Sequence, residues 1–451
     1  MGKLVIHPIL QEIAGIFTRH GKQVFLVGGA VRDLLRGHKA QDWDLATDAL
    51  PQEVIALFPR VIPTGIKHGT VTVHFKGRSV EVTTYRTESG YHDGRRPDQV
   101  TYTARIEEDL SRRDFTMNAI ALPLPKGPLV DPFNGIADIR AHRIRCVGDP
   151  QARFAEDGLR PVRAVRFAAQ MGFEVEQATL DAIPRALKTT EKVSPERIRD
   201  ELDKILASPQ PSRAFLLMEE TRLLELLLPE LASCRNIEQK GFHRFDVLDH
   251  SLLACDAAAR DQAPGLVRAA ALLHDIGKPV TRSLDLNGVW TFYQHEQVSA
   301  TLSRDLLTRF HYPNAVIEGI VHLIKEHMFH YEANWSDGAV RRFIIRVGEE
   351  NLNNLYQLRR ADAYATTGQD LPKDFLLPLI TRVDAVLAKS RALSLKDLPV
   401  SGKDLLIMGI KPGPIMGIIL SALLEAVVED PALNTKETLL TIAGKLKERY
   451  R

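Results

Sequence analysis

The stretch from Val24 to Asp48 constrains the fold of this chain more than any other part of the sequence. Its first residues, Val24–Val27, are an apolar run of the kind that forms a buried strand, and Gly28-Gly29 interrupts the run before residues 30–35 can wind into a helix. Glycines at the start of a helix let backbone N–H groups approach a phosphate closely, and the helix dipole adds partial positive charge there. The turn therefore predicts a phosphate site at Gly28 and Gly29.

The same stretch ends in the tripeptide Asp42-Trp43-Asp44. On a strand, the period of two sends both carboxylates to one face and Trp43 to the other. Two like charges so close repel each other unless a cation lies between them, and carboxylate oxygens suit Mg²⁺ bound to substrate phosphates. A lone D-x-D tripeptide is commonly a solvated turn, but this one follows a Gly-Gly-x-x-Arg-Asp turn. The combination favours a metal site at Asp42 and Asp44.

The pairing of GGAVRD at 28–33 with DWD at 42–44 resembles the nucleotidyltransferase core of the polymerase beta superfamily. Within that superfamily it is similar to the class II tRNA nucleotidyltransferases and their poly(A) polymerase relatives. The resemblance implies a catalytic head with a mixed sheet and helices, in which Asp42 and Asp44 are catalytic and hold Mg²⁺. It also implies a third carboxylate on a neighbouring strand.

Strands are expected to follow a short helix at 51–58. Two β-branched runs, 71–75 and 80–85, predict a hairpin that turns at residues 76–78. Glu81 lies on its second strand and is the candidate for the third catalytic carboxylate; otherwise it is an ordinary acid at a strand edge. The polar, glycine-containing segment 86–98 is expected to be a mobile loop over the site or a plain surface hairpin.

The segment RRDFTMNA at 112–119 is expected to open a helix. Adjacent arginines suit a triphosphate, because the guanidinium fork binds oxygens bidentately. This segment resembles the second motif of the family. The nucleotide-binding residues expected in the head are Gly28, Gly29, Arg32, Arg112, Arg113, Asp114 and Asn118.

The segment EDGLRPVRAVRF at 156–167 predicts a helix on which Asp157 and Arg160, three residues apart, share a face. An aspartate can accept from the amino group of cytosine or adenine and an arginine can donate to cytosine N3 or adenine N1, so the pair can imitate a complementary base. An isolated pair of this kind is usually a salt bridge, but the whole segment resembles the base-selecting motif of the family. Arg163 and Arg166 are further nucleotide-binding candidates. Pro161 fits only in the first turn of such a helix.

From residue 243 onward the sequence contains a second set of candidate metal ligands. Six imidazole and carboxylate groups lie in or beside helical apolar patterns, and side chains that converge from several helices are how a helical bundle builds a metal site. The segments resemble the HD phosphohydrolase domain, which implies a bound divalent transition metal or Mg²⁺ and possible hydrolysis of a phosphoester. The expected ligands are His250, His274, Asp275, His295, His327 and Asp362. A buried histidine can also be simply a hydrogen-bonded core residue.

At 451 residues with 44% hydrophobic content, the chain exceeds a single core. With the resemblance, four parts are expected in an α+β protein: a catalytic head at 1–148, an all-α base-selecting neck and body at 149–235, an HD-type helical domain at 236–370, and a helical tRNA-binding tail at 371–451. The tail is expected to hold an apolar helix to Val428 and an amphipathic helix ending near Tyr450.

The net charge of +2 means that a nucleic acid must meet a local basic face rather than bulk charge. Arginines crowd the second half of the head and its exit, which indicates such a face or an ordinary solvated surface. They are Arg86, Arg95, Arg96, Arg105, Arg112, Arg113, Arg140, Arg143, Arg145, Arg153, Arg160, Arg163 and Arg166.

The sequence shows neither a targeting pattern nor a cysteine motif. The first residues are too short and polar for a signal peptide, and no apolar run approaches the roughly 18 residues of a membrane span, so a cytoplasmic protein is expected. Cys146, Cys234 and Cys255 are widely spaced and suggest neither a disulfide framework nor a zinc site. They are expected to be small buried hydrophobes.

The resemblance covers nearly the whole chain and implies an enzyme that completes or repairs the 3′-terminal CCA of tRNA without a template. The expected partners are tRNA, CTP and ATP, and the oligomeric state stays open. One alternative is an A-adding or poly(A) polymerase, which uses the same motifs. Others are a metal-dependent HD phosphohydrolase whose head merely binds nucleotide, and a non-catalytic RNA-binding protein.

Overall fold

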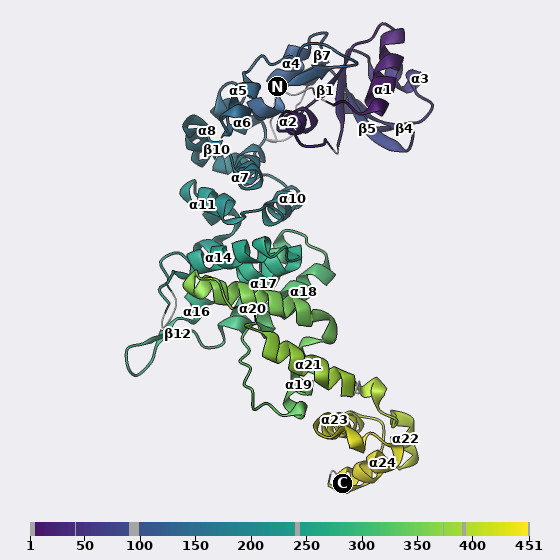
Figure 1. Cartoon of the computed structure of the whole chain (residues 1–451), viewed down its shortest axis with the longest axis vertical. Helices are drawn as coiled ribbons and strands as arrows, with labels where there is room; N and C mark the ends of the chain where they lie inside the picture. The colour runs from purple at the N-terminus through teal and green to yellow at the C-terminus, as the bar shows by residue number, and fades with distance from the viewer. Residues whose placement is uncertain are drawn as a thin grey trace. The chain divides into compact units, whose positions relative to one another are not determined.

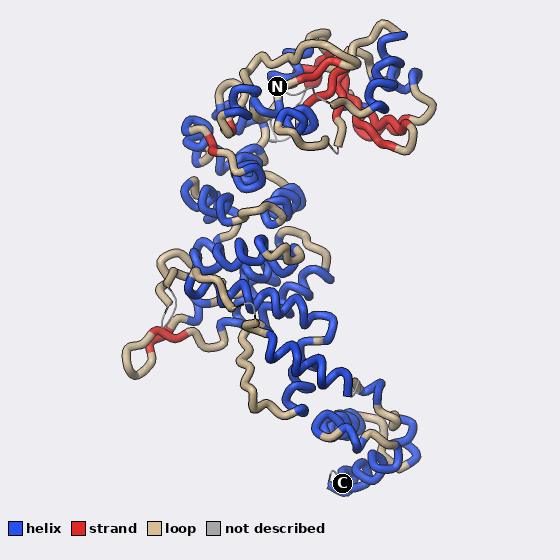
Figure 2. The backbone as a smooth tube through the Cα atoms, in the orientation of Figure 1, coloured by secondary structure: helices blue, strands red, loops and turns tan. Residues whose placement is uncertain are grey.

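The computed structural model describes residues 5–40, 42–89, 99–239, 244–372, 374–389 and 394–449. The chain divides into two compact units, of which the first takes in the residues up to Ala232 with the short segment 309–311, and the second takes in the rest (Figure 1). Figure 2 shows strands gathered mainly in the N-terminal part, while helices make up most of the remainder. The predicted α+β class is therefore confirmed.

A six-stranded mixed sheet forms the centre of the first unit, in the order β3-β4-β5-β2-β1-β8. Strand β1 is antiparallel to β2 and β8, whereas β2 is parallel to β5, so the middle of the sheet mixes both directions. The strands are β1 (Val24–Val27), β2 (Asp44–Thr47), β3 (Val61–Gly65), β4 (Thr70–Phe75), β5 (Arg78–Thr84) and β8 (Ala121–Pro123).

The N-terminal elements form where their sequence patterns place them. All four residues of β1 are buried, and the strand leads through Gly28 into α2 (Gly29–Leu35). Helix α1 (Pro8–Arg19) buries an apolar face that includes Phe17, and α3 (Pro51–Leu57) packs near β4. The predicted hairpin is confirmed, since β4 and β5 pair around a turn in which Lys76 and Gly77 have positive φ.

The predicted loop over 86–98 lies partly outside the described residues, which do not include 90–98 and so omit Arg95 and Arg96. Its described flanks are strands, because β6 (Arg86–Ser89) pairs antiparallel with β7 (Gln99–Tyr102). The flanks are therefore those of a hairpin.

Two predicted helices are wrong. The first is the helix opened by Arg112, because α4 (Ile106–Ser111) ends before that residue and only the 3₁₀ turn η2 (Thr116–Asn118) follows. The second is a continuous helix over 156–167. Helix α6 (Pro150–Glu156) ends, Asp157 has extended dihedrals of φ −143° and ψ 109°, and α7 (Arg160–Met171) then begins with Pro161 in its first turn, as its chemistry requires.

The rest of the first unit is mostly helical, apart from a short parallel pair of strands. Helix α7 packs against α10 and α11. The remaining elements are η1 (Ile66–His68), α5 (Gly135–Arg140), β9 (Arg143–Ile144), β10 (Glu174–Val175), α8 (Gln177–Ala182), η3 (Pro184–Ala186), α9 (Leu187–Thr190), α10 (Pro195–Leu206), α11 (Ser212–Glu220), α12 (Leu223–Leu227) and α13 (Pro229–Ala232).

The second unit is built on helices, with α14 packed along α20 and α15 packed against α14 and α18. Its elements are α14 (Val247–Arg260), α15 (Gly265–Leu273), α16 (Lys278–Thr281), β11 (Ser283–Leu284), β12 (Trp290–Thr291), α17 (His295–Arg309), α18 (Asn314–Glu326), α19 (Asp337–Val347), η4 (Glu349–Asn351), α20 (Leu352–Thr367), α21 (Leu377–Lys389), η5 (Leu395–Asp397), α22 (Gly402–Ile407), α23 (Pro414–Glu429), η6 (Pro431–Leu433) and α24 (Lys436–Arg449).

The C-terminal helices share a small core of their own. Leu405 of α22, Leu423 of α23 and Leu439 of α24 are fully buried in one apolar cluster. The two tail helices predicted from the sequence are thus confirmed as α23 and α24. All three cysteines are buried, as expected. Among the described helices, none combines the length and the apolar character that crossing a membrane demands.

Candidate active site and metal centre

The turn after β1 brings a cation and an acid to one point. Gly28 has φ +70°, a left-handed conformation that favours glycine. A Cβ atom on Gly28 would lie 2.9 Å from Nη1 of Arg113 and 3.6 Å from Oδ2 of Asp44. The absence of a side chain at Gly28 therefore leaves room for the Arg113 guanidinium and the Asp44 carboxylate, which both lie beside the turn.

The predicted acids lie along the neighbouring strands. Asp44 begins β2 and is in register with Glu81 on the parallel strand β5, so the two side chains share a face of the sheet. Asp42 and Asp44 are exposed while Trp43 between them is 8% exposed, which is the predicted alternation. The Trp43 indole donates to the carbonyl of Ala40 at 3.3 Å.

These acids affect one another electrostatically. Desolvation raises the pKa of Asp44. The positive charge of Arg113 lowers this pKa, and the negative charge of Asp42 raises it further. Partial desolvation also raises the pKa of Glu81, and the charge of Asp44 raises it further. Asp44 and Glu81, together with the neighbouring Asp42, are a donor set of hard carboxylate oxygens suited to a divalent cation such as Mg²⁺. The residues present therefore fit the expected metal.

Arg112 and Arg113 both donate hydrogen bonds to a buried carboxylate that the sequence analysis did not identify. Asp109 is fully buried and accepts from Nη2 of Arg112 at 2.8 Å and from Nη2 of Arg113 at 3.3 Å. Arg112 also donates to Glu88 on β6 at 3.1 Å. Nε of Arg113 is buried and has no hydrogen-bond partner in the described part of the chain, so this arginine keeps donor capacity for a ligand. The spacings of three and four residues from Asp109 to the arginines were a usable sequence signal.

A chain of hydrogen bonds runs from α2 to α7. Arg32 donates to Oδ1 of Asn118 at 2.9 Å, and Nδ2 of Asn118 donates to Asp114 at 3.0 Å. Asp114 also accepts from Nε of Arg163 at 2.8 Å. Burial alone would raise the pKa of Asp114, but Arg163, Asn118 and Arg160 together hold it well below its usual range. Asp114 is thus an ionised hub that joins the turn region to the helix.

Arg166 lies deeper on the same helix. Its Nε donates to Glu201 of α10 at 2.6 Å, and both side chains are buried. Burial lowers the pKa of Arg166 to about 10, against the opposing charge of Glu201. Arg163 and Arg166 therefore both have carboxylate partners within the protein.

Asp157 and Arg160 are not on one helical face. Oδ2 of Asp157 accepts from Arg197 of α10 at 2.8 Å. Arg160 is 8% exposed, and its guanidinium donates to Glu156 at 2.7 Å and to the carbonyl of Arg112 at 2.8 Å. Both charges still act on the Asp114–Arg163 pair. Arg160 lowers the pKa of Asp114, and Asp157 raises the pKa of Arg163.

The second unit gathers its six predicted ligands into one group, called here the His/Asp cluster. Each of the six is less than 9% exposed, and they come from five helices or their ends. The cluster consists of His250 in α14, His274 and Asp275 at the end of α15, His295 at the start of α17, His327 at the end of α18 and Asp362 in α20.

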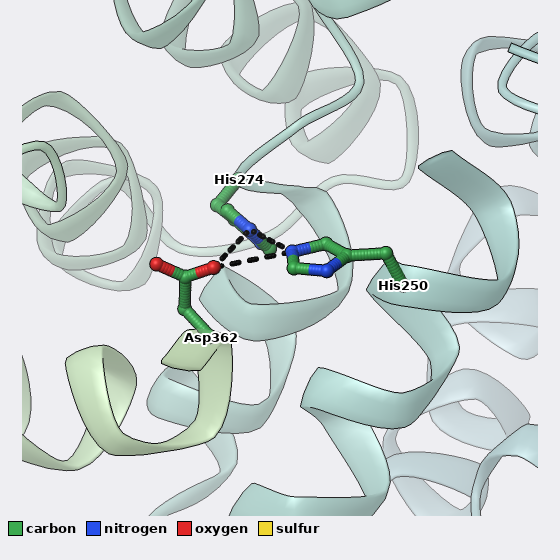
Figure 3. Close-up of side chains that lie close together, drawn as sticks. All are labelled: His250, His274 and Asp362. Atoms are coloured by element: carbon green, nitrogen blue, oxygen red, sulfur yellow. Dashed lines mark hydrogen bonds and ion pairs between the residues drawn. The ribbon is translucent and has the colours of Figure 1, made fainter. Parts of the chain in front are cut away.

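Four ligand atoms of the cluster converge. Nε2 of His250 lies 3.2 Å from Nε2 of His274 and 3.1 Å from Oδ1 of Asp362. Figure 3 shows these three side chains pointing toward one another. Nε2 of His274 lies 3.6 Å from the same oxygen. Oδ2 of Asp275 is 3.5 Å and 3.3 Å from the two imidazole nitrogens.

Backbone carbonyls orient three of the imidazoles. Nδ1 of His274, His295 and His327 lies 2.8, 2.8 and 2.6 Å from the carbonyls of Ala271, Phe292 and Ile324, each three residues earlier. A ring that donates from Nδ1 presents the Nε2 lone pair to its other side, which is how metal-binding histidines are held.

Two atoms of the cluster lack a hydrogen bond. Nε2 of His295 and Oδ1 of Asp275 are buried and lie 3.2 Å apart, yet neither makes a well-formed hydrogen bond to any described residue. Lys278, also buried, donates to Oδ2 of Asp275 at 2.6 Å and was missed by the sequence analysis despite its i+3 spacing. Buried imidazole nitrogens and carboxylate oxygens are the atoms that ligate divalent metals, so these residues fit a divalent metal.

The acids and imidazoles also shift one another's pKa. Burial disfavours charge on His274, but Asp275 and Asp362 raise its pKa to about 10. Burial and the His274 charge lower the pKa of His327 to about 3, so this ring is a neutral ligand. Burial would raise the pKa of both aspartates, but their neighbours hold it well below the usual range. For Asp275 these are chiefly the charges of His274 and Lys278, and for Asp362 the hydrogen bonds from His250 and His274.

Three family models match successive parts of the chain. The poly A polymerase head domain matches residues 24–145, and the RNA and SrmB-binding site of polymerase A matches residues 172–235. A third model, tRNA nucleotidyltransferase domain 2, matches residues 288–443.

The chain is also similar to named enzymes. The CCA-adding enzyme of Lactobacillus helveticus is 47% identical over 232 residues, which are 51% of this chain and 57% of that enzyme. The CCA-adding enzyme of Limosilactobacillus fermentum is 34% identical over 442 residues, 97% of this chain and 96% of its own. The crystal structure of the Bacillus stearothermophilus CCA-adding enzyme in complex with CTP covers 99% of both chains at 32% identity and a TM-score of 0.75. Because one relative aligns over almost its whole length, the chain belongs to the CCA-adding enzymes, a family of class II tRNA nucleotidyltransferases.

Proposed function

We propose that this protein adds or repairs the 3′-terminal CCA of tRNA from CTP and ATP, without a nucleic-acid template. The observation that carries the proposal is the position of Arg113 and Asp44 beside the glycine turn, in a chain that aligns with a CCA-adding enzyme over 97% of its length. The likeness to an enzyme solved with CTP supports the same substrate. We place the activity in the cytoplasm, where tRNA and nucleoside triphosphates meet.

In the proposed reaction the 3′-hydroxyl of tRNA attacks the α-phosphorus of the nucleotide, and pyrophosphate leaves. Asp42, Asp44 and Glu81 would hold Mg²⁺ on the exposed face beside the turn. When bound, this metal lowers the pKa of the attacking hydroxyl and neutralises the leaving pyrophosphate. Gly28 and Gly29 let the triphosphate approach the backbone closely, and Arg113 binds its oxygens. No side-chain base is required.

Base selection is assigned to Asp157 and Arg160. The aspartate would accept from the amino group of cytosine or adenine, and the arginine would donate to the adjacent ring nitrogen. Both side chains have protein partners, Arg197 and Glu156, so reading a base requires them to exchange or share these bonds. The other nucleotide-binding candidates belong to this proposal as side chains that hold the site in shape. Arg32, Asn118 and Arg163 do so through Asp114. Arg112 does so through Asp109, and Arg166 through Glu201.

The four parts expected from the sequence remain the proposed division of labour. They are a catalytic head at 1–148, a base-selecting part at 149–235, a metal-binding helical part at 236–370, and a tRNA-binding tail at 371–451. The boundary between the two compact units, at Ala232 and Ser233, supports the second of these limits.

The test uses three tRNA transcripts, which end before CCA, after CC and after the complete CCA. Each is incubated with CTP alone, ATP alone or both. We expect CTP to extend only the first transcript, ATP alone to complete only the second, and neither to extend the third. An enzyme that adds many adenosines to all three would instead be a poly(A) polymerase.

We infer a second function for the His/Asp cluster, which is metal-dependent hydrolysis of a phosphoester. The observation that favours it is the set of six buried ligands, in which Nε2 of His295 and Oδ1 of Asp275 have no well-formed hydrogen bond to any described residue. A divalent metal there would activate water and polarise a phosphoryl oxygen. Hydrolysis of p-nitrophenyl phosphate and of a nucleoside 2′,3′-cyclic phosphate, with Mg²⁺, Mn²⁺, Co²⁺ or Ni²⁺, tests this function, and no turnover with any ion would refute it.

A further inference from the structure

The last helices of the second unit form a bundle with a core of its own, called here the tail bundle (residues 394–449). Leu405, Leu423 and Leu439, from α22, α23 and α24, are fully buried in that core. Helix α19, which precedes the bundle in the chain, packs against α23. The contact between α19 and α23 therefore joins the tail bundle to the rest of the second unit.

A buried arginine lies at this contact. Arg341 of α19 is 4% exposed, and its Nη1 donates to the carbonyl of Val428 at 2.7 Å. Val428 is the next-to-last residue of α23, and the carbonyls at the end of a helix have no partner within the helix and carry partial negative charge. The Arg341 guanidinium thus caps α23 from a different helix, which fixes the C-terminal end of α23 on α19.

Gly338 lets the two helices approach each other at the same place. A Cβ atom on Gly338 would lie 2.9 Å from Cδ of Glu429, the last residue of α23. Arg342 also donates to Glu425 and Glu429, at 3.0 and 2.8 Å. Exposed ion pairs of this kind add little free energy, but they restrict the same helix end that Arg341 holds.

Helix α19 is itself held by the helices around it. Val340 and Phe343 on its inner face are buried, and α19 packs against α18, α20 and α21. Asp337, the first residue of α19, forms an ion pair with Arg382 of α21 at 2.5 Å. Arg341 therefore links the tail bundle to a helix that is fixed from several sides.

The N-terminal end of α23 differs in chemistry from the end at α19. The sequence has no acidic residue between Asp404 and Glu425, and Glu425 already lies at the contact with α19. A basic surface without carboxylates suits the phosphates of a nucleic acid. The side chains that are exposed on this surface are Ile407, Lys411, Ile415 and Ile418.

The length of α23 amplifies any change at the contact with α19. The helix has 16 residues, and at about 1.5 Å per residue its N-terminal end lies about 24 Å from its C-terminal end. A tilt of about 10° at the contact would move the N-terminal end by about 4 Å. A shift of that size exceeds the range of a hydrogen bond to a phosphate.

We propose that Arg341 is a positioning residue for tRNA. It fixes the direction of α23 and so places the basic end of that helix where tRNA meets it. The inference rests on the proposed tRNA-binding function of the tail, and it adds the residue and the contact that orient the tail. Because Arg341 is buried, it touches no substrate itself, and its loss should weaken tRNA binding without changing the chemical step.

The first test compares two RNAs that end in CC, a full-length tRNA and a hairpin that copies only its acceptor stem. We expect Arg341→Ala to raise KM for the tRNA about tenfold with kcat unchanged, because a loosened tail lowers the effective concentration of its binding surface. Both constants for the hairpin should stay unchanged. Arg341→Lys keeps the charge and should recover part of the loss. Arg346→Ala is the matched control on the same helix, since the Arg346 side chain is 55% exposed and pairs with Glu326, and it should change neither RNA's constants.

The second test measures the orientation of the tail bundle without RNA. Nitroxide labels at Glu318→Cys on α18 and Lys445→Cys on α24 report the distance between the two helices by pulsed electron paramagnetic resonance. The three native cysteines are buried, so the labels go to the introduced sites. We expect a narrow distance distribution in the labelled parent and a broad one after Arg341→Ala is added.

A further variant keeps the inference testable if Arg341→Ala does not fold. Gly338→Leu leaves Arg341 in place but puts a side chain where the end of α23 packs, so it should also broaden the distances and raise KM for tRNA alone. A narrow distribution or an unchanged KM for tRNA in a folded variant would overturn the positioning role and leave tRNA binding by the tail standing. Equal KM values of the wild type for tRNA and hairpin would overturn both, whereas addition to the hairpin would still report the activity of the head.

Discussion

Replacing Gly28 with alanine tests how the turn positions the triphosphate. The new Cβ would lie 2.9 Å from Nη1 of Arg113, about 0.6 Å closer than the contact distance of two heavy atoms. Nη2 of the same guanidinium donates to Asp109 at 3.3 Å, so moving Nη1 away from the new Cβ strains or breaks that hydrogen bond and displaces the charge. A displacement of this size at a reacting phosphate can cost about 100-fold in rate. We expect kcat/KM for CTP and for ATP to fall by about that factor, with their ratio unchanged.

The control separates the clash from backbone strain. Gly28 has φ +70° and Gly37 has φ +82°, but nothing lies within 4 Å of a Cβ on Gly37. Each alanine variant should lose about 1–3 kcal/mol of stability from its positive φ, measured by urea unfolding. Only Gly28→Ala should lose addition activity. Equal activity losses in the two variants, or a changed CTP to ATP ratio, would refute the proposed contact with Arg113.

Four further predictions follow from the same geometry. Asp44→Ala should abolish nucleotide addition while tRNA binding in a gel-shift assay persists, and substantial residual addition would sink the metal assignment. Asp157→Ala should lower discrimination against UTP and GTP by roughly ten- to a hundredfold, whereas Arg113→Ala should weaken all four nucleotides alike; unchanged ratios of kcat/KM would move base reading elsewhere. Asp114→Asn should lower the free energy of unfolding by about 2–3 kcal/mol at pH 7, measured with urea. Because the pKa of Asp114 is lowered in the folded state, its stabilising contribution is complete above about pH 4 and is lost as the pH falls through that lowered pKa. The difference in stability from the wild type should therefore shrink in acid. His274→Ala should remove phosphoester hydrolysis and spare CCA addition, and loss of both would mean that the two sites are coupled.

Local patterns made the core of the head predictable. The apolar run of β1, the glycine pair and the alternation of Asp42, Trp43 and Asp44 are set by neighbours in the sequence, and the structure has them as expected. The His/Asp cluster was also predictable from the sequence. Its ligands lie in or beside apolar helical patterns, and buried imidazoles and carboxylates are expected to converge on a shared metal.

The predicted continuous helix over 156–167 does not form because distant residues pack against its backbone. A Cβ on Gly158 would lie 2.3 Å from the carbonyl oxygen of Thr189, and Thr190 donates to the Gly158 carbonyl at 2.9 Å. The backbone at Gly158 is therefore fixed by a segment about thirty residues away, and the helix is interrupted there. Asp157 and Arg160 consequently face different partners, which spacing alone could not indicate.

The same cause applies to the segment after Arg112. Phe115 forms a bridge to Cys146, and the Thr116 amide donates to the carbonyl of Arg145 at 2.9 Å. These bonds use the backbone groups that a helix would need, so only a 3₁₀ turn forms. The partners Glu88 and Glu201 were equally out of reach, since they come from a distant strand and a distant helix.

The most direct test of the central claim is to sequence the 3′ ends produced when the purified protein acts on a tRNA transcript that lacks CCA, with all four nucleotides and Mg²⁺ present. The account predicts that most product ends in CCA and that addition stops there, although UTP and GTP are available. Tails of adenosine, incorporation of U or G at the first two positions, or no addition at all would contradict it.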